Sequence, residues 1–212
     1  MTPNYLGFVR LLTLIAAMGG LGALNSPQES YAEFYVAGQV GPQFSSQWGN
    51  VEAIGGPAGG SSSDVDLKNS IAFGAKAGYF FPQLPNLGLE VSASHAKPDI
   101  RVVTVAFNVI ARAQMKSFEP YAGVGLGLFF ARLKDVTGES RSDNGVPGFN
   151  ALAGYRSFLT DDKRLALMVE YNYQRAQLSF DHGLDPSVGL GTGLRGTYEA
   201  HTIMVGLSYH FQ

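Results

Sequence analysis

The sequence predicts an all-β protein, an eight-stranded antiparallel up-and-down transmembrane β-barrel. Three observations predict this fold. Eight segments alternate large apolar residues with small or polar ones at a period of two, which places each set on one face of a strand. The connections between these segments alternate between long and short, as in a barrel that spans an outer membrane. The small or polar set suits the narrow interior of an eight-stranded barrel, whereas the apolar set suits contact with lipid.

The N-terminal residues predict a secretory signal peptide. Arg10 supplies a positive charge, an apolar stretch follows, and a small-x-small pattern ends at Ala32. We expect cleavage between Ala32 and Glu33, so that residues 1–32 form the signal peptide and residues 33–212 form the barrel. The alternative is a membrane anchor, but the apolar stretch is short for a transmembrane helix and precedes a cleavage-like site.

The predicted strands follow in order along the mature chain. Most have about the 9–11 residues that a tilted membrane strand needs. They cover residues 33–45, 70–81, 87–94, 101–112, 121–131, 149–158, 165–174 and 201–211. Their outward apolar sets include Phe34, Val36 and Val40; Ile71, Phe73 and Tyr79; Leu87, Leu89 and Val91; Val103, Val105 and Phe107; Val124, Leu126 and Leu128; Phe149, Ala151 and Tyr155; Leu165, Leu167 and Val169; and Ile203, Val205 and Leu207.

The connections and the aromatic residues fit a membrane orientation. The longer connections span residues 46–66, 95–100, 134–148 and 177–199, and the tight turns span residues 82–86, 113–117 and 160–164. We therefore expect surface loops at one end and periplasmic turns at the other. Aromatic residues gather near the ends of the apolar faces, where they would form interfacial girdles: Phe34, Phe44, Tyr79, Phe81, Tyr155, Tyr173, Tyr209 and Phe211.

Composition excludes several classes of protein. The chain has 45% hydrophobic and 15% charged residues, unlike a disordered chain, and its net charge of −2 gives no basic surface for nucleic acid. There is no cysteine, so disulfides and thiolate metal sites are excluded. We expect no cofactor and no metal, because the four histidines show no zinc spacing. A G-x-G-x-x-G string at residues 191–196 lies in a glycine-rich loop before a strand, which does not fit a dinucleotide site.

The chain resembles the small eight-stranded outer-membrane β-barrel proteins, such as the transmembrane domain of outer membrane protein A, outer membrane protein X and the opacity-like proteins. The resemblance rests on the signal peptide, the eight alternating strands, the long loops and a last strand that ends on an aromatic residue. It implies that Gly206, Tyr209 and Phe211 form an assembly signal, read by the barrel assembly machinery. It also implies contact with outer-membrane lipid, lipopolysaccharide and periplasmic chaperones. We expect a monomer in the outer membrane of a Gram-negative cell.

The interior is expected to hold an ionic cluster of four residues: Lys76, Glu90, Arg156 and Glu170. Counting outward from Gln83 sets the first pair opposite each other, and counting outward from Lys163 does the same for the second pair. The alternative is four solvated charges on the wall, but unpaired charges are costly in a narrow barrel. The resemblance to outer membrane protein A, whose interior holds a similar cluster, supports the ionic interpretation.

The sequence leaves the function open between two classes. The first is a structural, envelope-stabilising barrel that displays surface loops and has no open pore, since eight strands leave no aqueous channel. The alternative is a lipid A-modifying enzyme of the deacylase or oxidase type. Ser92, Ser94, His95 and Asp99 lie near the outer rim, but they match no signature, and His95 is expected to face lipid. We therefore assign no catalytic residue.

Overall fold

The computed structural model describes residues 32–54, 63–66, 69–96, 101–134, 140–181 and 193–211 of the 212-residue chain. Residues 1–31 of the predicted signal peptide lie outside this part. Within the described residues the chain forms nine β-strands: β1 (Glu33–Ile54), β2 (Ser63–Asp66), β3 (Ser70–Phe81), β4 (Leu84–Ala96), β5 (Arg101–Arg112), β6 (Phe118–Lys134), β7 (Ser140–Phe158), β8 (Leu165–Asp181) and β9 (Gly193–Phe211). No helix of the described residues has the length and apolar composition to cross a membrane.

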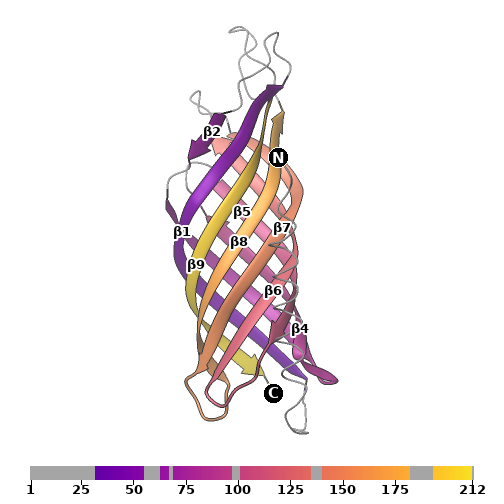
Figure 1. The fold of residues 1–212 in the computed structure, drawn as a ribbon, viewed down its shortest axis with the longest axis vertical. Coiled ribbons are helices and arrows are strands. Elements are labelled where there is room, and N and C mark those ends of the chain that lie inside the picture. The colour runs from indigo at the N-terminus through magenta and orange to yellow at the C-terminus, as the bar shows by residue number, and fades with distance from the viewer. Residues whose placement is uncertain are drawn as a thin grey trace, which may run out of the picture.

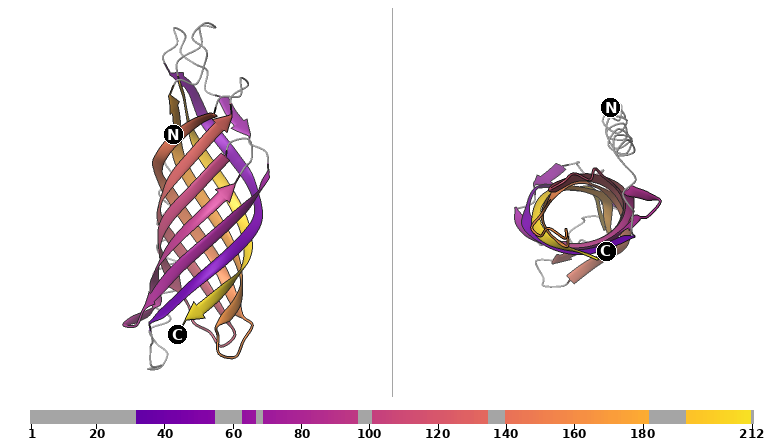
Figure 2. Two further views of the ribbon diagram at one scale, coloured as in Figure 1. Left: turned by 180° about the vertical axis from the view of Figure 1, so that it is seen from behind. Right: turned by 90° about the horizontal axis from the view of Figure 1, so that it is seen from below.

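Eight of the strands close into a barrel. β1 and β3 to β9 pair in sequence order, every pair is antiparallel, and β9 pairs back with β1 (Figure 1). The view along the axis shows an unbroken ring of strands (Figure 2). The predicted fold class is therefore confirmed. Closure leaves none of these eight strands as an open edge of the barrel, which lipid would not tolerate.

The two faces of the barrel wall follow the predicted alternation. Large apolar side chains point outward, including Ile71, Phe107 and Leu126, which are 62%, 62% and 72% exposed. The alternating inward side chains are small, polar or charged, and many are buried. Such a wide exposed apolar surface marks a face that lipid covers.

Six strands extend further toward the loop end than the sequence predicted: β4 to Ala96, β6 to Lys134, and four others by more. β1 continues to Ile54, β7 begins at Ser140, β8 continues to Asp181, and β9 begins at Gly193. The pairing of β1 with β9 reaches the last residue of β1, with two register shifts on the way. Backbone pairing continues there without an outward apolar set, so apolar alternation does not reveal it. The short strand β2, which pairs only with β1, was also predicted as loop.

The register across two hairpins differs from the prediction by two residues. Lys76 lies opposite Ser92 rather than Glu90, because β3 and β4 are joined by a turn at residues 82–83 and an irregularity that leaves residues 85–87 unmatched on β3. Arg156 likewise lies opposite Met168 rather than Glu170. A slip of two preserves the face on which a side chain lies, so all four charged residues remain inward.

The turn after β7 explains the second slip. The Lys163 N–H donates to the Thr160 carbonyl, the Leu159 N–H donates to the Leu165 carbonyl, and Lys163 adopts a φ of 54°. These bonds centre the hairpin on residue 162 instead of Lys163. Hydrogen bonds from the Thr160 hydroxyl and the Arg164 N–H hold the pKa of Asp162 below its ordinary value and order this turn.

Candidate functional site in the barrel lumen

The inward charged residues form two neighbouring groups in the half of the lumen nearer the turns. The upper charged group comprises Lys76, Glu90 and Glu170. The lower charged group comprises Glu33, Arg112, Glu119, Arg156 and His210. All eight residues are at most 9% exposed, so neither group is a set of solvated wall charges.

Lys76 from β3 links the two carboxylates of the upper charged group. Its Nζ lies 3.1 Å from Glu90 Oε1 on the neighbouring strand β4 and 2.6 Å from Glu170 Oε2 on β8. The second of these bonds crosses the lumen, because β3 and β8 are not neighbours in the barrel. One ammonium thus holds two carboxylates from different sides of the wall. Asn108 donates a further hydrogen bond to Glu90 Oε1 at 3.2 Å.

The sequence predicted that Arg156 pairs with Glu170. In the structure Arg156 belongs instead to the lower charged group. Its Nη1 lies 2.8 Å from Glu119 Oε1 on β6. The two-residue slip moves Arg156 toward the turn end, away from Glu170 and level with Glu119, its direct cross-strand partner.

Sequence reasoning did not include the other members of the lower charged group. Arg112 Nη1 bridges Glu33 Oε2 at 2.6 Å and Glu119 Oε2 at 3.2 Å, and its Nε donates to the Pro85 carbonyl at 2.8 Å. His210 Nδ1 lies 2.5 Å from Glu33 Oε1. These residues stand at or next to the ends of their strands. Their inward parity was the signal that could have found them.

Aromatic side chains link the two charged groups. The Tyr35 hydroxyl donates to Glu90 Oε2, and the Tyr121 hydroxyl donates to Glu170 Oε2 at 2.8 Å. The Arg156 guanidinium carbon lies 4.2 Å from the Tyr35 ring centroid and 4.4 Å from that of Tyr121. The cation therefore contacts both rings, an arrangement that favours a desolvated guanidinium.

Two glycines make room for these tyrosines in a repeated arrangement. Tyr35 lies opposite Gly78, and Gly78 lies opposite Glu90, so the tyrosine leans over the glycine to reach the carboxylate. The second half of the barrel repeats the row with Tyr121, Gly154 and Glu170. The sequence carries the same repeat, Glu-x-Tyr at residues 33–35 and 119–121 and Ala-x-Ala-Gly-Tyr at residues 75–79 and 151–155. This internal repeat was the missed signal for the tyrosine–carboxylate bonds.

We expect Gly78→Ala and Gly154→Ala to lower the free energy of unfolding by about 1–3 kcal/mol each, since a displaced tyrosine leaves a buried carboxylate without one donor. A Cβ at Gly78 would overlap the Tyr35 ring, and one at Gly154 would lie 2.8 Å from the Tyr121 hydroxyl. Gly38→Ala is the matched control, because nothing lies within 4 Å of its Cβ position. Urea titration in detergent micelles measures the difference. Equal stability of all three variants would contradict the packing argument.

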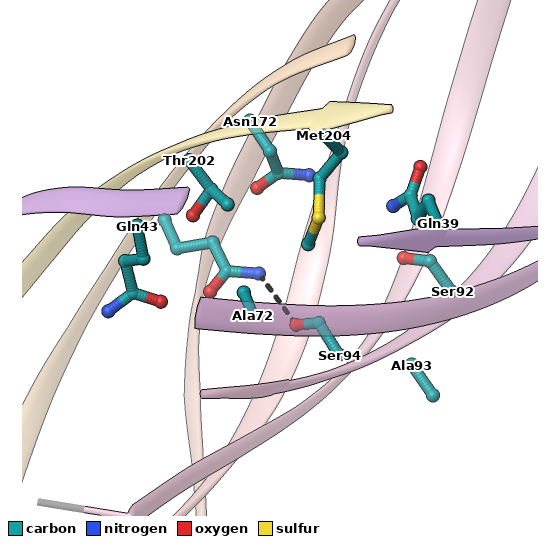
Figure 3. Close-up of a pocket in the computed structure, with 10 residues that line it drawn as sticks. Gln39, Gln43, Ala72, Ser92, Ala93, Ser94, Asn172, Thr202 and Met204 are labelled. Atoms are coloured by element: carbon teal, nitrogen blue, oxygen red, sulfur yellow. Dashed lines mark hydrogen bonds between the residues drawn. The ribbon is translucent and has the colours of Figure 1, made fainter. Parts of the chain in front are cut away.

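A small polar cavity lies in the lumen (Figure 3). It adjoins the upper charged group, because its lining residues Ser92 and Met204 lie opposite Lys76 and Glu170. Its volume of ≈10 Å³ is about the space that admits one water molecule. The Gln174 amide donates to Ser94 Oγ across it at 3.3 Å. Gln39 Oε1 and Asn172 Oδ1, which belong to lining residues, have no hydrogen-bond partner within the described chain. The cavity therefore suits a donor such as water. Its lining residues are Gln39, Gln43, Ala72, Ser92, Ala93, Ser94, Asn172, Gln174, Thr202 and Met204.

An apolar layer fills the lumen beyond the cavity. Phe129 from β6, Leu178 from β8 and Tyr198 from β9 are each 0% exposed and belong to one cluster. The ring centroids of Phe129 and Tyr198 lie 6.4 Å apart, and the Gln43 amide donates a hydrogen bond of 3.0 Å to the Tyr198 hydroxyl. The lumen thus contains, from turn end to loop end, two charged groups, a small polar cavity and an apolar layer.

The predicted assembly signal lies at the seam that closes the barrel. Gly206 lies opposite Gln39 of β1, and a Cβ there would collide with the Gly38 carbonyl. Tyr209 and Phe211 point outward, and their ring centroids lie 4.9 Å apart. At the other side of this seam β1 begins at Glu33, directly after the predicted cleavage site at Ala32.

The structure does not assemble the serine and histidine set considered for lipid A chemistry. Ser92 and Ser94 face the lumen, where they bond Asn108 and Gln174. His95 lies opposite Phe73 and Val103, on the outward face, and Asp99 lies outside the described residues.

The other histidines and the glycine string add no site among the residues that the structure describes. His201 lies on the outward face and bonds the Tyr171 hydroxyl. His182 lies outside the described residues, as do the first two residues of the glycine string, and residues 193–196 of that string begin β9 rather than a helix. No group of metal-binding side chains occurs in the described part of the chain.

Comparisons with known proteins agree with this architecture. A family model for the outer membrane protein β-barrel domain matches residues 13–211. The crystal structure of Neisserial surface protein A is similar, with a TM-score of 0.58 and 18% identity over 85% of this chain and 99% of that one. The outer membrane protein OprG from Pseudomonas aeruginosa is similar with a TM-score of 0.61 and 14% identity, over 87% and 98% of the two chains. At these identities the likeness concerns the fold alone. No curated protein matches the chain.

Proposed function

The chain belongs to the outer membrane protein β-barrel domain family, and from this premise we propose that it is a closed structural barrel that stabilises the cell envelope and displays its long loops at the surface. Its place is the outer membrane, and its lumen does not conduct. The observation that carries the proposal is the bond of 2.6 Å between Lys76 on β3 and Glu170 on β8, which crosses the lumen between two strands that are not neighbours in the wall.

The contents of the lumen support a closed barrel. A solute would have to break buried ion pairs in the charged groups and then displace the packed rings of Phe129 and Tyr198. Eight-stranded barrels have interiors just wide enough for side chains to fill. Desolvated ion pairs are strongly destabilised when one partner is lost, so the plug resists stepwise opening.

The proposal includes partners for assembly and for the mature state. The signal peptide directs export in a Gram-negative cell, periplasmic chaperones carry the unfolded chain, and the barrel assembly machinery reads Gly206, Tyr209 and Phe211. The folded monomer contacts outer-membrane lipid and lipopolysaccharide through its apolar belt, and it binds no nucleic acid. The outward aromatic pair at the end of β9 and the close approach of Gly206 to β1 support the role of the last strand.

The experiment compares cells that lack the gene with cells complemented by it. We expect the deletion to increase sensitivity to detergent and to EDTA, and complementation to restore resistance. Mass spectrometry of lipid A should give the same species in both strains. A lipid A species that depends on the protein would replace the structural role with an enzymatic one, and unchanged sensitivity would remove the envelope role.

A further inference from the structure

Three strands carry an arginine as the first outward residue beyond their apolar run at the loop end. These residues are Arg101 on β5, Arg132 on β6 and Arg175 on β8. Each lies next to an apolar or aromatic outward residue of its strand, on the side of the loops. All three are exposed. They stand where the lipid-facing surface of their strand ends.

Among the described residues, Arg175 has an acidic partner and the other two arginines have none. Arg175 lies directly opposite Glu199 on β9, and the two side chains form an ion pair of 3.1 Å. Arg101 lies directly opposite Arg132 instead. Neither residue of this second pair makes an ion pair within the described chain. Like charges directly opposite each other on one face of a sheet are destabilising, so this position favours a bound anion.

The neighbouring row shows where that anion would lie. One row toward the membrane, Val103 lies opposite Phe130, and Phe130 is 42% exposed. The arginine pair therefore borders the apolar belt directly, at the level where lipid tails give way to headgroups. Guanidinium groups bind phosphate through two parallel hydrogen bonds, and two of them on adjacent strands can hold one phosphate from both sides.

We propose that Arg101 and Arg132 together bind a phosphate group of a lipid in the outer leaflet, with the lipid's acyl chains along Val103 and Phe130. This site deepens the lipid contact of the proposed function and rests on the placement of the barrel in the outer membrane. It makes the outward face of β5 and β6 a specific lipid site rather than part of a uniform belt.

The test uses native mass spectrometry of the folded full-length barrel in detergent micelles with lipid A as the probe. The variant is Arg101→Gln/Arg132→Gln, and the matched control is Arg175→Gln/Glu199→Gln, which removes an arginine that the protein itself neutralises. We expect the variant to bind phosphorylated lipid A roughly tenfold more weakly than the wild type. The control should bind as the wild type does. Lipid A stripped of its phosphates should bind all three proteins equally weakly.

Three outcomes would overturn the site. Equal binding of lipid A by the variant and the wild type would show that the pair is not involved. Equal losses in the variant and the control would show that the loss is not specific to this arginine pair. Displacement of the lipid by inorganic phosphate at the same concentration would show a free-phosphate site instead. A difference in gel migration between boiled and unboiled samples confirms that each variant is folded. The envelope phenotype of the gene deletion does not depend on these two residues, so failure of this lipid site is separable from failure of the proposed function.

Discussion

Replacing Lys76 by methionine is expected to lower the free energy of unfolding by about 3–5 kcal/mol, because it leaves two buried carboxylates without their shared cation. Lys76 lies 3.1 Å from Glu90 and 2.6 Å from Glu170, and all three side chains are buried. The tyrosine hydroxyls that donate to these carboxylates carry no charge and cannot replace the ammonium. The loss is measured by urea titration of the barrel in micelles. The folded fraction at each urea concentration is read from the different gel migration of boiled and unboiled samples.

Two controls separate this effect from a general loss of packing. The double variant Lys76→Met/Glu170→Gln should recover about half of the lost stability, since it removes one stranded charge together with its partner. Arg164→Met removes an exposed ion pair with Asp162 in a turn, and it should change stability by less than about 1 kcal/mol. If Lys76→Met and Arg164→Met are equally mild, the upper charged group does not hold the barrel together.

Deleting residues 209–212 is expected to remove most of the folded protein from the outer membrane, by about tenfold or more, because an unclosed barrel leaves open edges in lipid. Tyr209 pairs with Leu165 on one side and Val36 on the other, and the Phe211 ring lies 5.6 Å from that of Phe34. Cell fractionation, with boiled and unboiled samples compared on a gel, measures the folded fraction.

A single substitution separates an assembly signal from plain stability. Phe211→Ala should fold from urea into micelles in vitro, yet leave protein in the periplasm of cells. The matched control is Ile203→Ala, which removes an outward apolar side chain of β9 away from the terminus and should assemble normally. Normal assembly of both the deletion and Phe211→Ala would show that the end of β9 is not read as a signal.

The fold was predictable because its evidence is local in the sequence. Lipid imposes one rule on every membrane strand, so segments such as residues 101–112 and 165–174 reveal both faces at once. Beyond the lipid the rule ends while backbone pairing continues, which is why the extension of β1 to Ile54 was missed. The strand β2 pairs only with that extension, and it was missed for the same reason.

The sequence could predict which face of the wall each charged side chain of the candidate site occupies, but not which residues pair with each other. The inward positions of Lys76 and Glu90 follow from alternation alone. Their register depends on turn geometry, which a two-residue slip changes without moving any side chain to the other face. The choice of Glu119 rather than Glu170 for Arg156 follows from that slip. The bond from Lys76 to Glu170 joins strands on different sides of the barrel, and no count along a hairpin can find it.

Planar-bilayer recording of the purified, heat-modifiable protein tests most directly whether the barrel is closed. The charged groups and the layer of Phe129, Leu178 and Tyr198 occupy the lumen at two levels. We therefore predict no conductance steps at either polarity, under conditions in which a large porin recorded in parallel gives clear openings. Regular ohmic steps from the folded wild-type protein, absent from a boiled sample, would contradict a sealed structural barrel.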